Sequence, residues 1–255
     1  MVTVTSGSRG IAIVTGGSRG IGRACCLKLA REGYTVVVNY ATHAEAASRA
    51  VHEIETSGGK ALAVAGDVSK EADVLTLFAE ADKLGPLKVL INNAGVMDTQ
   101  ARLDEMGAER LRRIFDINIL GSFLCAREAV KRMSTKHGGT GGAIVNQSSA
   151  AAVLGAPGLG VDYAASKGAI DALTIGLGRE VAAEGIRVNA VRPGIIDTEI
   201  HQSSGIPGRV KMMRDLIPIK REGKAEEVAD VIMWLVSDQS SYVAGAIVAV
   251  AGGRC

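Results

Sequence analysis

Aromatic residues are scarce in this sequence of 255 residues: three Phe, four Tyr and one Trp make up 3% of it. A large core therefore cannot be built on aromatic side chains, and we expect Val, Ile, Leu and Ala to fill it. Hydrophobic residues are nevertheless 47% of the chain and charged residues 22%, which excludes an intrinsically disordered chain. The length suits one large α/β unit, and the sequence has no linker-like break, so we expect a single domain.

An excess of charge of one sign is also missing. Lys and Arg number 29 against 27 Asp and Glu, which leaves a formal net charge of +2. This balance argues against a nucleic-acid or membrane-surface partner. No apolar run reaches the length of a membrane span, and the first residues lack the hydrophobic stretch of a signal peptide. We therefore expect a cytoplasmic protein that acts on a small molecule.

Metal-ligand spacing is absent as well. The four cysteines and the four histidines are scattered, so we expect no metal site. Cys25 and Cys26 are adjacent in an expected helix, which disfavours a disulfide between them and fits a reducing compartment. The residues concerned are Cys25, Cys26, Cys125, Cys255, His43, His52, His137 and His201.

Short β-branched runs alternate with longer Ala-rich stretches that have helical patterning. The runs are continuous and apolar, which is typical of strands in a parallel sheet covered on both faces. We therefore expect an α/β fold: a doubly wound, Rossmann-like parallel sheet of about seven strands with helices on both faces. The expected strands are residues 11–15, 35–39, 61–65, 89–92, 143–146, 187–191 and 247–250. The expected helices are residues 20–32, 44–57, 70–83, 162–184 and 225–237, with a long helix within 105–136.

Two segments stand apart from this alternation. Residues 1–10 are polar and precede the first strand, so we expect a flexible tail and then one catalytic domain over residues 11–255. Residues 197–223 are longer than an ordinary connection, which makes them a candidate lid loop. The lid carries more basic than acidic residues. This excess favours an anionic substrate, and the alternative is a solvated face with ordinary charges.

The pentapeptide Gly-Ser-Arg-Gly-Ile occurs twice, starting at Gly7 and at Gly17. The first copy lies in the polar tail. The second copy follows the first strand and opens a helix, where backbone N–H groups favour an anion. The spacing of Gly16, Gly20 and Gly22 differs from the Gly-x-Gly-x-x-Gly fingerprint. The place between strand and helix, rather than the spacing, therefore predicts a nucleotide site, and a plain tight turn is the alternative.

Four motifs together resemble the short-chain dehydrogenase/reductase family: TGGSRGIG at 15–22, NNAG at 92–95, YAASK at 163–167 and PGIIDT at 193–198. The resemblance extends from about residue 11 to residue 253, and within the family it is to bacterial 3-oxoacyl-(acyl carrier protein) reductases and glucose dehydrogenases. It implies a nicotinamide dinucleotide as cofactor. The cofactor-binding residues that it implies are Gly16, Ser18, Arg19, Gly20, Ile21, Gly22, Asn39, Asp67, Val68, Asn93, Ala94, Gly95, Tyr163, Lys167, Pro193, Gly194, Ile196 and Thr198.

The second strand bears on the choice between NADP and NAD. An acidic residue about 20 positions after the glycines would accept from the ribose 2′-hydroxyl and select NAD, and no Asp or Glu occurs between Gly33 and Glu45. Arg19 stands where NADP-preferring relatives often carry a base, so NADP (NADPH) is favoured. NAD stays possible, because many such relatives have a second Arg where this chain has Ala41.

The third strand is followed by Asp67 and Val68, which resemble the pair that holds the adenine ring. An Asp that precedes a helix cap at Ser69 is the alternative interpretation.

Tyr163 and Lys167 are four residues apart on an expected helix, so they share one face. A phenol titrates near ~10, and a neighbouring ammonium favours the phenolate and lowers the pKa. The tyrosine could then give a proton to a carbonyl oxygen or take one from an alcohol. The spacing alone also suits a plain surface pair. The resemblance assigns Tyr163 and Lys167 to catalysis and adds Asn118, the helix residue that anchors a proton-relay water to the lysine.

The resemblance also implies a serine that polarises the substrate carbonyl at the end of the fifth strand. By this likeness it is Ser149, which lies fourteen positions before Tyr163, one more than in most relatives. We expect the extra residue within 154–161, where the pocket wall would then differ. Ser148 stays an alternative, because adjacent residues of a strand point to opposite faces and only one of the two serines can serve.

These features favour an NADP-dependent oxidoreductase that moves hydride between nicotinamide and a carbonyl or alcohol carbon. Two alternatives stay open: an NAD-dependent sugar or polyol dehydrogenase, and a non-catalytic dinucleotide-sensing protein on the same fold. The resemblance implies a homotetramer. The stretch 162–184 carries small and apolar residues on more than one face, so it needs cover from more than the sheet.

Overall fold

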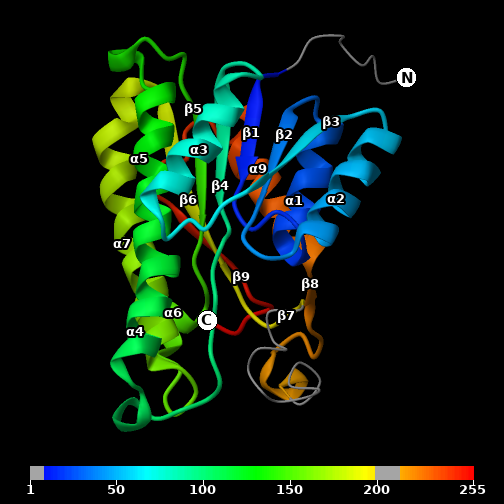
Figure 1. Cartoon of the computed structure of the whole chain (residues 1–255). Helices are drawn as coiled ribbons and strands as arrows, with labels where there is room; N and C mark the ends of the chain where they lie inside the picture. The colour runs from blue at the N-terminus through cyan, green and yellow to red at the C-terminus, as the bar shows by residue number, and fades with distance from the viewer. Residues whose placement is uncertain (1–8, 199–212) are drawn as a thin grey trace.

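The computed structural model describes residues 9–198 and 213–255 of the chain (Figure 1). A seven-stranded parallel sheet forms its centre, in the order β3-β2-β1-β4-β5-β6-β9. The strands are β1 (Ile11–Val14), β2 (Thr35–Tyr40), β3 (Lys60–Ala65), β4 (Leu87–Asn92), β5 (Gly142–Gln147), β6 (Ile186–Pro193) and β9 (Ile247–Val250). A separate parallel pair joins β7 (Ile196–Asp197) to β8 (Gly223–Lys224). The expected fold class is confirmed.

Helices cover both faces of the sheet (Figure 1). On one face α1, α2 and α9 pack together, and on the other α3, α5 and α7. The helices are α1 (Gly20–Arg31), α2 (Ala44–Thr56), α3 (Glu71–Asp82), α4 (Ala108–Phe115), α5 (Gly121–Met133), α6 (Ala151–Leu154), α7 (Val161–Val181) and α9 (Ala225–Val236).

Strand β1 shows why the strands are apolar without alternation. Ala12 and Val14 belong to the cluster under α1 and α9, whereas Ile11 and Ile13 belong to the cluster on the other face. Side chains of a strand point to opposite faces in turn, and here both faces are buried. Burial of both faces therefore selects an unbroken apolar run.

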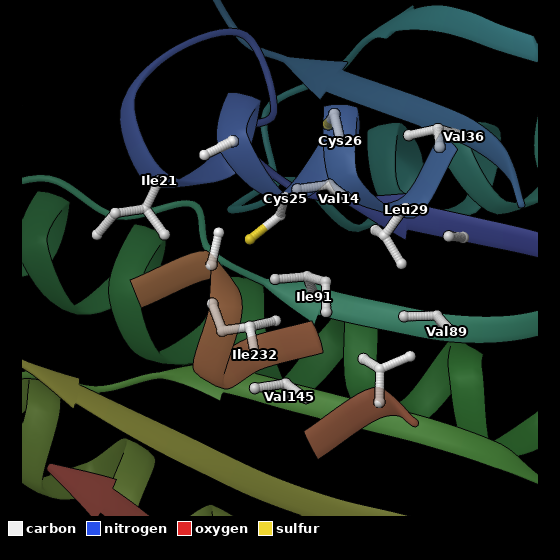
Figure 2. Close-up of a cluster of buried hydrophobic side chains, with 14 of the residues drawn as sticks. Val14, Ile21, Cys25, Cys26, Leu29, Val36, Val89, Ile91, Val145 and Ile232 are labelled. Atoms are coloured by element: carbon white, nitrogen blue, oxygen red, sulfur yellow. The ribbon is translucent and has the colours of Figure 1, made fainter. Parts of the chain in front are cut away.

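Two adjacent cysteines on α1 help to fill the first cluster. Figure 2 shows Cys25 and Cys26 among Val14, Ile91 and other side chains of the sheet and of α9. Burial raises the pKa of the Cys25 thiol to about 12, so this thiol stays protonated and packs as a small apolar group. All four cysteines are free.

The order of the strands places the site. Strand β1 lies between β2 and β4, so the chain leaves β1 toward one side of the sheet and returns at β4 on the other. The carboxyl ends of β1 and β4 thus border the point where the winding reverses, and doubly wound sheets bind their ligands at this point.

Three elements differ from the expected ones. The long helix within 105–136 is instead α4, a π-helical turn over Asp116–Leu120, and α5. The short helix α6 and the β7–β8 pair were not expected, because elements of two to four residues show no periodicity. No helix among residues 9–198 and 213–255 is both long and apolar enough to cross a membrane.

Arg9 and Gly10, the last two residues of the expected flexible tail, pack against the rest of the domain. The backbone N–H of Arg9 donates to the Gly33 carbonyl at 3.1 Å, and the Arg9 guanidinium lies over the Tyr34 ring, 5.5 Å from its centre. Gly10 is buried, and its carbonyl accepts from Thr35 N–H at 3.1 Å. The end of the first pentapeptide copy thus packs against the start of β2, while Gly7 and Ser8 lie outside the described residues.

Candidate active site

A groove of about 410 Å³ crosses the carboxyl ends of β1, β2 and β4. It is lined by twelve of the residues that the resemblance assigned to the cofactor: Gly16, Ser18, Arg19, Gly20, Ile21, Asn39, Asp67, Val68, Asn93, Ala94, Gly95 and Thr198. These residues come from five separate stretches of the chain. The topology therefore brings the nucleotide motifs together along one groove.

The glycine turn between β1 and α1 is held from both sides. The Asn93 side-chain amide donates to the carbonyls of Thr15 and Gly16, at 2.8 and 3.0 Å. On the other side the Asn39 carbonyl accepts from Gly17 N–H at 2.8 Å. Gly22 packs behind the turn, where a Cβ would come within 2.4 Å of the Gly16 oxygen. Gly22 does not itself line the groove. It therefore affects the groove indirectly, through its contact with the turn.

The start of α1 suits an anion. Its N-cap, Arg19, makes no side-chain capping hydrogen bond, and no acidic residue lies in the first turn. The first N–H groups of a helix have no partner within the helix, and together they carry a partial positive charge. A pyrophosphate therefore fits at this end of the groove.

The next part of the groove follows β2. It is lined by Tyr40, Ala41, Thr42 and His43, together with Arg19. The sequence had pointed to Asn39 as a cofactor-binding residue here. Its amide nitrogen instead donates hydrogen bonds to the carbonyls of Val64 and Gly66, at 3.3 and 3.0 Å. Asn39 thus ties β2 to β3. The strand-end position of residues 40–43 was the available signal for them.

Asp67 is the acidic residue that lines this groove among those described. Its Oδ1 accepts from the N–H and the hydroxyl of Ser69, at 3.0 and 2.7 Å. The expected helix cap at Ser69 is wrong, because α3 begins at Glu71 with Lys70 as its N-cap. Asp67 therefore both closes a turn and faces the groove beside Val68.

Helix α7 supplies the Tyr163–Lys167 pair. The Lys167 Nζ lies 5.7 Å from the centre of the Tyr163 ring and donates to the Gln147 carbonyl at 2.7 Å. Gly95 lies on the other side, where a Cβ would come within 3.4 Å of this Nζ and 3.3 Å of the Asn118 Oδ1. The absence of a side chain at residue 95 thus leaves room between the groove and the lysine.

Lys167 is 3% exposed, although it carries an ionisable group. Burial lowers the pKa of this ammonium from 10.5 to about 8, and the nearby Asp171 carboxylate opposes the shift. The ammonium form is costly in such a place, so the lysine gives up its proton far more readily than a lysine in water. Asp171 also pairs with Arg192 at 2.7 Å.

Asn118 lies in the π-helical turn between α4 and α5 and is fully buried. Its amide nitrogen donates to the Val96 carbonyl and to the Ser166 hydroxyl, at 2.9 and 3.0 Å, and its Oδ1 accepts from Val96 N–H at 2.8 Å. The side chain therefore ties the stretch after β4 to α7. A π-helical turn often marks a functional position.

The two serines after β5 point in different directions. The Ser148 hydroxyl is buried and donates to the Lys167 carbonyl at 3.2 Å. The Ser149 hydroxyl is half-buried and accepts from Ala151 N–H at 3.1 Å. Ser149 is thus the more exposed of the two residues, and both serines line a second cavity.

A second cavity opens beside the groove and shares Ile21, Gln147 and Thr198 with it. Tyr163, Pro193, Gly194 and Ile196, which were expected at the cofactor, line this cavity. Its wall includes Leu154, Ala156, Leu159 and Gly160 from the stretch where we expected the extra residue.

Sequence reasoning missed several residues of this region. Gln147 lies where the groove and the cavity meet, and its buried Oε1 has no hydrogen-bond partner in the described part of the chain. Arg254, near the end of the chain, lines the cavity without any sequence signal. The position of Gln147 just before the serine pair was the one available signal for it.

Of the expected lid, residues 197–223, the structure describes residues 197–198 and 213–223. Met213 of the expected lid lines the cavity. Two of the basic residues are neutralised, since Arg214 pairs with Glu222 and Arg221 with Glu227, both at 2.7 Å. Residues 213–223 still carry three basic side chains against two acidic ones, and Arg209 and Lys211 lie outside the described residues, so the expected preference for an anionic substrate stays a prediction.

Comparison with known proteins agrees with this geometry. The family model described as enoyl-(acyl carrier protein) reductase matches residues 16–254. The chain is 56% identical to an uncharacterized oxidoreductase, YgfF, of Escherichia coli, over 96% of this chain and 99% of that one. It is 40% identical to glucose 1-dehydrogenase 2 of Bacillus subtilis, with 95% and 93% covered. It is 36% identical to a 3-oxoacyl-[acyl-carrier-protein] reductase of Staphylococcus aureus, with 95% and 96% covered.

Solved structures show the same architecture. A dehydrogenase/reductase from Sinorhizobium meliloti superposes with a TM-score of 0.88 at 33% identity, over 98% of this chain and 96% of that one. A double mutant of a Serratia marcescens short-chain dehydrogenase/reductase gives 0.88 at 34%, over 97% and 98%. The chain is therefore an oxidoreductase that belongs to the short-chain dehydrogenase/reductase family.

Proposed function

We propose that this chain interconverts a carbonyl group and the corresponding alcohol with NADP(H), and that Ser149, Tyr163 and Lys167 act on the carbonyl oxygen. One observation carries the proposal. The nucleotide groove and the apolar cavity meet at Gln147 and Thr198, and the Lys167 Nζ lies directly behind this junction, bonded to the Gln147 carbonyl. A hydride donor in the groove and a carbonyl compound in the cavity would meet beside Tyr163.

The chemistry follows from these side chains. Bound in the groove, NADPH would supply the hydride that the carbonyl carbon receives. The Ser149 hydroxyl donates a hydrogen bond to the carbonyl oxygen and polarises the bond. The Tyr163 hydroxyl gives its proton to the same oxygen, so that the alcohol forms. In the oxidative direction the tyrosine takes this proton back.

Lys167 and Asn118 support the tyrosine. The ammonium of Lys167 favours the phenolate form of its neighbour, because opposite charges attract strongly where water is excluded. After Tyr163 has given its proton away, the Lys167 ammonium passes a proton to the phenolate. The lysine would then regain a proton from solvent by way of a water chain held at the π-helical turn of Asn118. The side chain of Asn118 keeps this turn and α7 in fixed register, through Ser166.

A preference for NADP over NAD is part of the proposal. The stretch after β2 that lines the groove, residues 40–43, holds no carboxylate that would repel a 2′-phosphate. Arg19 lines the same groove and is exposed, so its guanidinium can pair with that phosphate. Arg19→Ala should then weaken NADPH binding and leave NADH binding nearly unchanged.

A second candidate function is an NAD-dependent sugar or polyol dehydrogenase. The 40% identity to glucose 1-dehydrogenase 2 favours it, as does Ala41 at the place of a second cation. A non-catalytic dinucleotide sensor is disfavoured, because such a protein needs no intact set of Asn118, Ser149, Tyr163 and Lys167.

A substrate screen tests the proposal. Purified protein is incubated with NADPH or NADH and with β-ketoacyl thioesters, diketones and sugars, and the reduced nicotinamide is followed by its absorbance. We expect turnover of a carbonyl compound with NADPH. Turnover of a sugar with NAD alone would select the second candidate, and tight nucleotide binding without any turnover would select the sensor.

The oligomer that we propose is a homotetramer. Helix α7 leaves Ala165, Ala172, Ile175 and Gly176 exposed on the single chain, and a Cβ at Gly176 would meet nothing within 4 Å. An apolar helix face of this kind needs cover from another subunit. Light scattering at micromolar concentration should give four times the chain mass, and a monomer mass would contradict this.

A further inference from the structure

The cavity beside Tyr163 is mostly apolar. Its walls come from α6 and the turn that follows it, from the stretch that joins β6 to β7, and from two methionines. The apolar lining residues are Ile21, Met97, Ala150, Ala151, Leu154, Ala156, Leu159, Pro193, Ile195, Ile196 and Met213. Such walls favour a substrate with a hydrocarbon body.

Four ionised side chains also line this cavity: Asp98, Arg110, Asp162 and Arg254. Three of them are neutralised by ion pairs. Arg110 binds Asp162 through two nitrogens, at 2.8 and 3.3 Å, and Asp98 pairs with Arg113 at 2.6 Å. These pairs leave no net charge for a ligand to meet.

Arg254 differs from these three. Its guanidinium has no ion pair and no hydrogen bond within the described ranges 9–198 and 213–255, and the residue is half-buried. A cation that is partly removed from water beside apolar walls attracts an anion more strongly than a surface cation does. Among the described residues that line the cavity, one charged side chain therefore has no ionic partner, and its charge is positive.

The backbone holds Arg254 in the wall of the cavity. After β9 the chain turns through Gly252 and Gly253, both with positive φ, and Arg254 N–H donates to the Ala251 carbonyl at 3.0 Å. Ala251 packs against Gly194, where a Cβ would come within 2.8 Å of the Ala251 Cα. Gly194 itself lines the cavity. The position of the arginine thus follows from a tight turn that is anchored to the cavity wall.

We propose that Arg254 binds a carboxylate of the substrate, so that the chain acts on an oxo-acid, or its hydroxy-acid, whose apolar body lies between the acid and the reacting carbonyl. This inference rests on the proposed function, because it takes Ser149 and Tyr163 as the place of the carbonyl oxygen. A single guanidinium offers the two parallel N–H groups that match one carboxylate.

The test uses a series of straight-chain oxo-acids in which the carbonyl moves stepwise away from the carboxylate, each compared with its methyl ester. We expect the best acid to exceed its ester roughly tenfold in kcat/KM, as a charge-assisted hydrogen bond at a half-buried site predicts. Arg254→Gln should remove this preference by raising the KM for the acid, so that the acid and its ester have similar kcat/KM. Arg254→Lys should keep part of it.

A matched control separates local from general charge effects. Arg31 is exposed in the last turn of α1 and does not line the cavity, so Arg31→Gln should leave the preference intact. Equal losses for acid and ester in Arg254→Gln, or no preference in the native protein, would overturn the inference while the proposed function stands.

A binding measurement covers the case without turnover. Titration calorimetry or ligand-detected NMR with an unreactive straight-chain carboxylate, and with its amide, should show binding of the carboxylate alone, and only when Arg254 is present. If no carbonyl compound turns over but this binding persists, the proposed function falls and the anion site remains. If the carboxylate and the amide bind alike, the inference falls.

Discussion

Lys167→Met should change how the stability of this protein depends on pH. The folded chain lowers the pKa of Lys167 from 10.5 to about 8 by burial. Below about pH 8 the lysine is protonated in both states, so the folded state bears the full cost of a buried ammonium. Between pH 8 and 10.5 the unfolded chain holds a proton that the folded chain has released. The free energy of unfolding therefore rises with pH in this window.

The magnitude follows from the shift. Each unit of pKa corresponds to about 1.4 kcal/mol. Between about pH 7 and pH 10, the unfolding free energy of the native protein should therefore rise by about 2.5 kcal/mol relative to that of the Lys167→Met variant.

Urea unfolding without nucleotide, at equal protein concentration, measures the difference at several pH values. Lys60 is exposed on β3, so Lys60→Met should give a constant difference. A flat line for Lys167→Met as well would refute the reasoning, because the lysine would then not titrate differently in the folded chain.

Two further substitutions test the supports of the site. Gly22→Ala should weaken NADPH binding roughly tenfold or more and destabilise the fold by about 1–3 kcal/mol. The reason is that the new Cβ would come within 2.5 Å of the Asn93 amide and 2.4 Å of the Gly16 oxygen. Unchanged NADPH affinity in a fluorescence titration would contradict this packing of the turn. Asp162→Asn should lower the free energy of unfolding in urea by about 3 kcal/mol, because the Arg110 and Asp162 side chains are only 13% and 1% exposed. Adding Arg110→Met to the same chain should restore most of this loss. If it restores none, the broken ion pair is not the cause of the loss.

The sheet could be predicted from the sequence because of where its strands lie. Both faces are buried, so each strand is an unbroken apolar run, such as Ile11–Val14. All seven expected strands exist, with ends that differ by a few residues. The π-helical turn at Asn118 could not be predicted, since one extra residue per turn leaves no mark in the hydrophobic pattern of residues 105–136.

The nucleotide groove could be predicted to a similar extent. Residues such as Gly16, Asn93 and Gly95 lie at the ends of strands, so the strand positions place them at one edge of the sheet. The details depended on contacts between distant segments. Asn39 joins strands β2 and β3, and Arg254 reaches the site from a place where the sequence shows no motif.

The central claim is that the Tyr163 hydroxyl transfers the proton, and Tyr163→Phe tests it most directly. The measurement is the single-turnover rate of NADPH oxidation with an accepted carbonyl compound, together with the dissociation constant of NADPH for the same protein. We predict that the rate falls about 100- to 10,000-fold, as the loss of a general acid requires. NADPH affinity should stay unchanged, because the ring keeps its place over Lys167. A rate like that of the native protein would contradict the account.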